Sequence, residues 1–349
     1  VIFSTTKSEY GHHIRPLVVS SFYKVAHRID GKSAIRTSIK SCLVTGSNTM
    51  VRESKAFSPC NITGFFEIHR ELTDPLQIGS TGVSIAIGHG VITQLTTRRA
   101  RTPRFRATFN GRPLTKSSVS AFVAHKYAVL SGVNWDLRIA HHCQMPTGCG
   151  FGTSGAGALS LSFALNDALN LSLSKVEAAQ IAHISEIVCG TGLGTVASVF
   201  LGGMTVRVRP GAPGEGRSRV IHTTPSTRVL TFSYGPLATQ RVLRSKLLRQ
   251  RVNKCGKGLT EEFDPRNPAS SFMSLSKKFA ECLGLASVRL SKTIKELDSN
   301  GLTSSMMMLG ESLFSILPDA ESLPSKEFLQ RTIPSAMVSS ITKSGACLI

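Results

Sequence analysis

The order of strand-like and helix-like segments along the chain predicts an α+β protein with two lobes. The chain has 349 residues, which is enough for two domains of ordinary size. Hydrophobic residues make up 41% and charged residues 18%, a balance that is typical of a globular protein and not of a disordered chain. We therefore expect an N-terminal domain over residues 51–218 and a C-terminal domain over residues 219–349.

Strand patterns open the first of these domains. Residues 55–68, KAFSPCNITGFFEI, predict a strand, a turn and a second strand. Residues 79–95 alternate around small and β-branched residues after a glycine-rich entry, which predicts another strand. The segment RVRPG at 207–211, with the glycines after it, indicates a connection between elements.

Helical patterns dominate the middle of the chain and return near its end. Residues 154–169 are rich in alanine and leucine, and residues 175–187 repeat apolar side chains at helical spacing. After residue 219 we expect one strand and then three helices, the first of them basic and amphipathic, over 228–233, 241–257, 270–283 and 287–297. The segment MMMLGESLFSIL and a strand-like SAMVSSI close the chain.

Residues 1–49 differ in composition from the rest of the chain. They are basic, rich in serine and threonine, poor in acids and without methionine, and Met50 follows them directly. Transit peptides have this composition. An over-extended gene model with Met50 as the native start is the second interpretation, and we favour it because motif-dense sequence begins just after Met50. We leave this extension out of the fold prediction.

The formal net charge of +20 is compatible with nucleic acid, an anionic membrane surface or small anionic substrates as partners. Besides the N-terminal extension, basic residues gather over 98–112 and 241–257. Aromatic side chains hardly interleave with these charges, so the stacking platforms of single-strand binding are not indicated. We expect a solvated basic surface and no nucleic-acid partner.

The cysteines and the hydropathy exclude further classes of protein. The eight cysteines are scattered and form no CxxC pair, which argues against a zinc site and against a dense disulfide framework. We expect reduced thiols in a cytoplasmic protein. No uninterrupted run of about 18 apolar residues occurs, so we expect no membrane span.

The strongest functional signal is the segment PTGCGFGTSGAG at 146–157, which runs directly into the helix predicted over 154–169. The first N–H groups of a helix have no partner within it, and the helix dipole favours negative charge there, so such a loop can bind phosphate. The hydroxyls of Thr153 and Ser154 could bind a phosphate or Mg²⁺. Tight packing of a helix on a sheet also requires small residues and is the alternative. The segment is neither a Walker A loop nor a clean GxGxxG motif.

A resemblance to a known family sharpens this interpretation. Pro146-x-x-x-Gly150-Phe151-Gly152-Thr153-Ser154-Gly155-Ala156 is similar to the second motif of the GHMP kinases, PxxxGLGSSAA. Further blocks resemble the archaeal pantoate kinases of that superfamily in their order, at 58–68, 74–88, 183–203 with RVRPG, 233–243 and 305–314. The resemblance covers roughly residues 51–349. It implies the two-lobed GHMP-kinase fold, with the active site in the cleft between the lobes.

The resemblance also implies an activity. A pantoate kinase transfers a phosphoryl group from ATP, with Mg²⁺, to a hydroxyl of pantoate, and the 4-phosphopantoate formed leads to coenzyme A. Kinship further implies a homodimer. Two alternatives stay open: a GHMP kinase for another small alcohol such as homoserine or mevalonate, and a catalytically weak nucleotide-binding homologue.

Roles for individual residues follow from the matching motifs. The ATP-binding loop consists of Pro146, Gly148, Gly150, Phe151, Gly152, Thr153, Ser154, Gly155 and Ala156. The resemblance places Mg²⁺ on Ser154 and Glu186, whose oxygens suit that ion. It implies that pantoate contacts Ser80, His183, Arg207 and Thr239. Arginine is a natural receptor for a carboxylate, whereas His183 could equally be a buried helix histidine with a partner of its own.

One residue departs from the family pattern. Members typically have TGLGDV, whose aspartate is the expected base, and this chain has TGLGTV with Thr195 at that place. A threonine hydroxyl cannot act as a general base near neutral pH. Phosphoryl transfer depends mainly on positioning and charge neutralisation, so the loss of a base, a factor of roughly 10²–10⁴, slows the reaction without abolishing it. We therefore expect a kinase with altered proton handling and list Thr195 with the catalytic residues.

Overall fold

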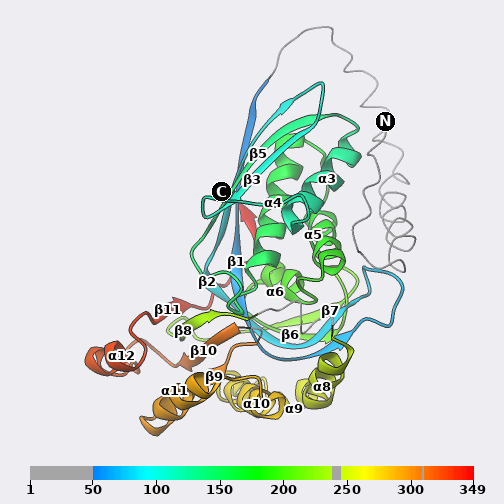
Figure 1. Ribbon diagram of the computed structural model, residues 1–349. Helices are drawn as coiled ribbons and strands as arrows, with labels where there is room; N and C mark the ends of the chain where they lie inside the picture. The colour runs from blue at the N-terminus through cyan, green and yellow to red at the C-terminus, as the bar shows by residue number, and fades with distance from the viewer. Residues whose placement is uncertain (1–49, 238–244, 309) are drawn as a thin grey trace.

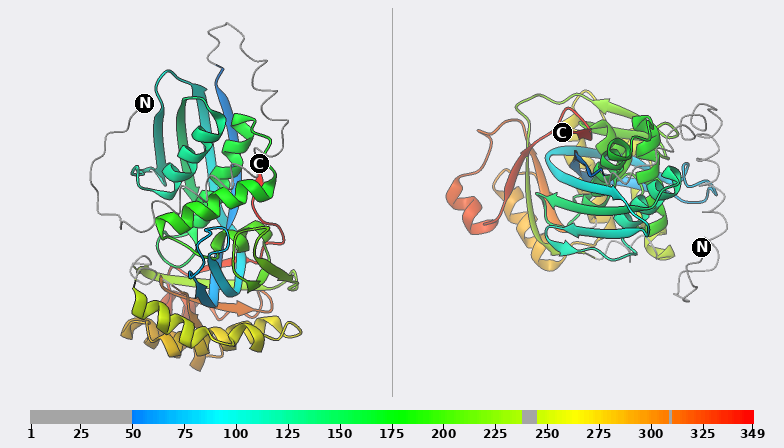
Figure 2. Two further views of the ribbon diagram at one scale, coloured as in Figure 1. Left: turned by 90° about the vertical axis from the view of Figure 1, so that its right-hand side faces the viewer. Right: turned by 90° about the horizontal axis from the view of Figure 1, so that it is seen from above.

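The computed structural model describes residues 50–237, 245–308 and 310–349. Two sheets organise these residues, so the predicted α+β class with two lobes is confirmed (Figure 1). The boundary predicted at 218/219 stays a prediction. Helices α3, α4 and α6 contact the strands of the first sheet and α5 packs on these helices, whereas α8–α11 lie at the opposite end of the molecule (Figure 2).

The first sheet has a long antiparallel hairpin, β1–β2, at its centre. Its strands follow the order β12-β1-β2-β5-β3-β4, and β6 extends from the first half of β2 and carries β7. The bounds are β1 (Arg52–His69), β2 (Gly79–Arg99), β3 (Arg104–Phe109), β4 (Arg112–Pro113), β5 (Trp135–Cys143), β6 (Met204–Arg209), β7 (Arg217–Ile221) and β12 (Cys347–Leu348).

The strand–turn–strand predicted over residues 55–68 was wrong, because β1 is one continuous strand paired with β2 along its length. The register shifts between Pro59 and Cys60, and again between Thr63 and Phe65. Proline and glycine in a strand favour such bulges, and the same residues favour turns, so the local pattern was ambiguous. The first half of β1 packs against α4 and the second half against α8 and α10, which joins the two lobes.

Helices α3, α4 and α6 contact the first sheet and α5 packs on all three, so α4 is the central helix of this layer. Their bounds are α3 (Val119–Ser131), α4 (Thr153–Leu169), α5 (Lys175–Cys189) and α6 (Thr195–Leu201). Alanine, serine and leucine occupy most of α4, and nearly all of its side chains are buried because it contacts both β1 and β2. A capping box between Ser174 and Glu177 starts α5. Both helices lie where the sequence predicts them.

The second sheet is antiparallel and forms the other lobe. It has the order β11-β8-β10-β9, with β8 (Arg228–Pro236), β9 (Ser305–Met306), β10 (Gly310–Leu317) and β11 (Met337–Ser340). Its helices are α8 (Lys246–Gly256), α9 (Leu259–Glu262), α10 (Pro268–Leu283), α11 (Val288–Ser299) and α12 (Lys326–Thr332). The strand and three helices predicted after residue 219 correspond to β8, α8, α10 and α11. Residues 241–244 of the predicted basic helix lie outside the described residues.

Two further expectations need correction. Cys255 of α8 and Cys282 of α10 form a disulfide with a Cα–Cα distance of 5.7 Å, so the expectation of reduced thiols was wrong for this pair. The pairing depends on the packing of α8 beside α10, which the spacing of the cysteines does not reveal. The segment 207–211 is a connection only from Pro210 onward, because Arg207 lies inside β6.

The described part of the chain contains no helix with the length and apolar character needed to cross a membrane.

The close approach of α10 to β1 at Gly64 can be tested by substitution, with Gly157 as the control. A carbon added at Gly64 would come within 2.1 Å of Ser276 Oγ and 2.5 Å of the Phe272 ring, whereas one added at Gly157 in α4 meets nothing closer than 3.5 Å. We expect Gly64→Ala to lower the free energy of unfolding by roughly 1–3 kcal/mol. The control Gly157→Ala should leave it unchanged or raise it, because alanine favours a helix. Urea unfolding measures both, and equal stability of the two variants would contradict this packing.

Candidate active site

A pocket of about 190 Å³ lies where the glycine-rich loop before α4 meets the start of α6 and the ends of β2 and β6. It contains, among others, Ser80, Gly150, Ser154, Thr195 and Arg207. A larger cleft of about 1190 Å³ adjoins it and shares the lining residues Gly148, Phe151, Thr153, Ser154 and Thr191. Residues of both lobes line the larger cleft, from β3 and α3 on one side to β8 and β11 on the other.

The glycine-rich loop has the backbone geometry of an anion site. Gly148, Gly150 and Gly152 have φ values of 74°, 90° and 62°, in the left-handed region that favours glycine. Gly152 is the N-cap of the 17-residue helix α4, and no side chain caps this end. The first N–H groups of α4 therefore have no side-chain cap, and they lie at the end of the helix that borders the pocket. The helix dipole also favours negative charge at this end.

A buried carboxylate lies directly behind the loop. Glu186 of α5 is 2% exposed, and its Oε1 accepts hydrogen bonds from Ser154 Oγ and, at 2.7 Å, from Thr191 Oγ1. Its Oε2 has no hydrogen-bond partner among the described residues. Burial raises the pKa of this carboxyl, and the two hydroxyl donors oppose that shift. A carboxylate with an unpartnered oxygen beside a serine hydroxyl is a donor set that Mg²⁺ accepts, so these residues fit such an ion.

A buried cation lies on the other side of the pocket. Arg207 of β6 is 3% exposed, and its guanidinium donates to Ser80 O at 3.3 Å and to Ser84 Oγ and Ser198 Oγ at 2.7 Å each. All these acceptors are neutral, and no ion pair of Arg207 occurs in the described chain. Burial lowers the pKa of Arg207 to about 10, so the group stays charged at neutral pH. The pocket is therefore built for an anionic group such as a carboxylate.

Thr195 and Asn61 both line the pocket and both lie against Gly152 of the glycine-rich loop. Thr195 begins α6, and a carbon added at Gly155 or Gly152 would come within 2.6 or 2.7 Å of its Cγ2. Asn61 of β1 also lines the pocket. Asn61 was not among the predicted site residues. A polar residue within the apolar run of a predicted strand was the pattern that could have indicated it.

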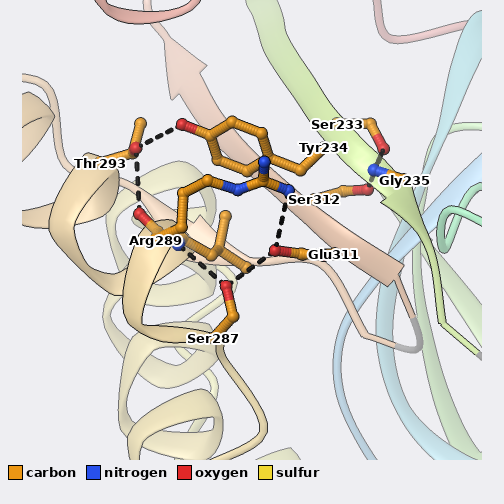
Figure 3. Close-up of polar contacts among 9 residues, drawn as sticks. Ser233, Tyr234, Gly235, Ser287, Arg289, Thr293, Glu311 and Ser312 are labelled. Carbon is orange, nitrogen blue, oxygen red and sulfur yellow. Dashed lines mark hydrogen bonds and ion pairs between the residues drawn. The ribbon is translucent and has the colours of Figure 1, made fainter.

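The far wall of the larger cleft is held by polar contacts of the second lobe (Figure 3). The Arg289 guanidinium lies 3.7 Å from the centroid of the Tyr234 ring and 3.3 Å from Glu311. Tyr234 shares a hydrogen bond with Thr293, and Ser287, the N-cap of α11, donates to Glu311. These contacts tie the end of β8, which lines the cleft, to α11 and β10.

The structure brings most of the predicted site residues together. Ser80, Arg207, Thr195 and the loop from Gly148 to Ser154 line the small pocket, Pro146 lines the larger cleft, and Glu186 contacts Ser154. Gly155 and Ala156 belong to the first turn of α4 and are buried. Thr239 lies outside the described residues.

His183 occupies a different place from the other predicted residues. It is 1% exposed, does not line the pocket, and its Nε2 donates to Ile78 O at 2.9 Å. Burial lowers its pKa to about 4. The structure thus favours the second interpretation of His183, a buried helix histidine with a partner of its own. Its hydrogen bond to Ile78 O holds the segment just before Ser80 in place.

Comparisons with known proteins agree on one family. The family model described as the GHMP kinases N terminal domain matches residues 116–203. A pantoate kinase of Thermococcus kodakarensis is 31% identical over 281 residues, which are 79% of this chain and 91% of that relative. A pantoate kinase of Methanospirillum hungatei is 32% identical over 276 residues, 78% of this chain and 90% of the relative.

Structural similarity supports the same fold. A solved structure described as a phosphotransferase related to the CoA biosynthesis pathway has a TM-score of 0.74 and 28% sequence identity. The match covers 85% of this chain and 98% of that chain. The GHMP-kinase fold expected from the motifs is thereby confirmed.

The burial of His183 predicts a pH dependence of stability. Its pKa of about 4 in the folded protein is below the ordinary value of 6.5, so the unfolded chain binds the proton more readily. The contribution of the neutral ring is present above pH 6.5 and is lost as the pH falls toward 4. We expect His183→Gln to weaken the fall in thermal midpoint over this range, relative to wild type. An unchanged pH profile in the variant would contradict the buried neutral state.

Proposed function

Because the chain belongs to the pantoate kinase family of the GHMP kinases, we propose that it transfers the γ-phosphoryl group of ATP to pantoate. The product is 4-phosphopantoate, an intermediate of coenzyme A biosynthesis. The chain is thus a small-molecule kinase. The observation that carries the proposal is Arg207, a buried cation without a carboxylate partner beside a loop built for phosphate.

The nucleotide occupies the glycine-rich loop and the larger cleft. Its phosphates bind the free N–H groups at the start of α4, where the left-handed glycines let the backbone approach closely. The larger cleft, next to this loop, has the volume for the nucleoside and is lined by Phe109, Leu114 and Met145 as well as by polar groups. ATP therefore reaches from the larger cleft into the small pocket.

Ser154 and Glu186 hold the Mg²⁺ that accompanies the nucleotide. The ion neutralises charge on the phosphates when it is bound. The supporting observation is Glu186 Oε2, a buried carboxylate oxygen without a partner in the described chain, beside a hydroxyl that already contacts the same side chain. A buried carboxylate of this kind is costly unless a cation compensates it.

Arg207 and Ser80 anchor the pantoate carboxylate. The carboxylate supplies the counter-charge for the guanidinium. Nε and Nη1 already donate to Ser80 O, Ser84 Oγ and Ser198 Oγ, so Nη2 is the nitrogen that donates to the carboxylate. Ser84 and Ser198 hold the guanidinium from behind, so that it is oriented before the substrate arrives. The small pocket then holds the rest of pantoate with its hydroxyl toward the γ-phosphate.

Thr195 leaves the site without the aspartate that family members typically have. Its hydroxyl cannot take up a proton at neutral pH. Catalysis therefore depends on orientation and on charge neutralisation by the loop and the metal ligands. A catalytically weak nucleotide-binding homologue is the second candidate, and Thr195 is the observation that favours it. A homodimer and a cytoplasmic location remain predictions.

Turnover of a panel of alcohols tests the proposal. We expect purified protein with ATP and Mg²⁺ to phosphorylate pantoate in preference to homoserine, mevalonate and shikimate, because its relatives at 30–32% identity are pantoate kinases. All four compounds carry a carboxylate that Arg207 could bind, so the panel tests the rest of the pocket. Ser154→Ala and Glu186→Ala should each lose Mg²⁺-dependent activity by roughly 10² or more. Turnover of another panel member but not of pantoate would refute the substrate, and ATP binding without turnover would favour the weak homologue.

A further inference from the structure

Asn61 has an unusual hydrogen-bond pattern for a residue that is only 2% exposed. Its N–H donates to Phe151 O at 3.0 Å, which ties β1 to the glycine-rich loop. Its Nδ2 donates to Thr63 Oγ1 at 3.3 Å, which fixes the orientation of the amide. Its Oδ1 is buried and has no hydrogen-bond partner in the described part of the chain. A buried acceptor without a partner is destabilising, by roughly 1–3 kcal/mol.

Two unpartnered polar atoms lie at or directly behind this pocket. Among the described residues, five buried side-chain atoms lack a hydrogen-bond partner, and two of them are Asn61 Oδ1 and Glu186 Oε2. The second is explained by the metal ion proposed above. The first is a neutral amide oxygen, which accepts a hydrogen bond from a donor. Native structures rarely leave such an atom without a functional reason.

The position of Asn61 indicates which donor it awaits. A carbon added at Gly152 would lie 2.0 Å from Asn61 Oδ1 and 2.7 Å from Thr195 Cγ2. The amide oxygen is thus against the phosphate-binding loop and beside the residue that occupies the place of the family's base. Arg207, which would hold the carboxylate of the substrate, lines the same pocket. Asn61 and Thr195 line this pocket too, so a substrate held by Arg207 would place its hydroxyl near both side chains.

We propose that Asn61 is a catalytic residue whose Oδ1 accepts a hydrogen bond from the attacking hydroxyl of the substrate. The inference rests on the proposed function and assigns the attacking hydroxyl a hydrogen-bond acceptor. The hydrogen bond fixes the rotation of the hydroxyl, so that a lone pair of its oxygen faces the γ-phosphorus. Such orientation lowers the barrier because it removes freedom that the reactants would otherwise lose in the transition state.

The proton must be accounted for, because a neutral amide does not take it up. The bond from the hydroxyl oxygen to the γ-phosphorus forms while the bond from that phosphorus to the bridging oxygen breaks, and ADP leaves with the electron pair. The transition state is loose, so the hydroxyl loses its proton late. As the new bond forms, the O–H turns away from Asn61 Oδ1 and its proton passes to an oxygen of the transferred phosphoryl group. No base is required, which fits a site with Thr195 in place of aspartate.

Three variants at this position test the role. We expect Asn61→Ala and Asn61→Ser to lower kcat for pantoate roughly 10²-fold, because the hydroxyl loses its acceptor. Asn61→Asp keeps an acceptor in the same place. Its kcat should exceed that of Asn61→Ala and should rise with pH as the new carboxylate ionises. Affinity for a non-hydrolysable ATP analogue and the thermal midpoint, measured for each variant, show that the site is still folded.

The outcomes separate this inference from the proposed function. If wild type phosphorylates pantoate and Asn61→Ala keeps its kcat, the role of Asn61 is refuted and the function stands. If Asn61→Ala and Asn61→Asp are equally slow at every pH while both bind the nucleotide normally, Asn61 is a packing residue and the inference is again wrong. If wild type does not turn over pantoate, the proposed function itself fails.

Discussion

Two opposite charges, Glu186 and Arg207, are buried at the same pocket, and neither has a counter-ion among the described residues. Burying an ion without a partner is strongly unfavourable, so both groups are held by neutral hydroxyl and carbonyl partners that reduce the cost only in part. The ligands complete the electrostatics of the site. In the proposed complex, a metal–nucleotide complex would compensate the carboxylate and a substrate carboxylate would compensate the guanidinium.

The fold places these charges through different elements. Glu186 is on α5 and Arg207 is on β6, while the hairpin β1–β2 contributes Asn61 and Ser80 to the same pocket. The hairpin continues into the second lobe, where α8 and α10 pack on it. The site is therefore anchored by the strands that join the lobes, and the left-handed glycines of the phosphate loop close it from the side of α4.

Local patterns predicted the parts of the site that depend on local geometry. The loop at 146–157 and the helices α4 and α5 follow from glycine spacing and apolar periodicity, and Ser80, Arg207 and Thr195 followed from the family resemblance. Other features depend on contacts between distant segments, which cannot be predicted from the local pattern of a single sequence. These are the bulges in β1, the Cys255–Cys282 pair and the unpartnered oxygen of Asn61. His183 was ambiguous because its partner, Ile78 O, belongs to another element.

The most direct test is a crystal structure with Mg²⁺, pantoate and a non-hydrolysable ATP analogue. The account predicts the γ-phosphate on the N–H groups at the start of α4, the metal between Ser154 and Glu186, and the substrate carboxylate on Arg207. A nucleotide bound away from this loop, or a carboxylate that leaves Arg207 without a charged partner, would contradict it.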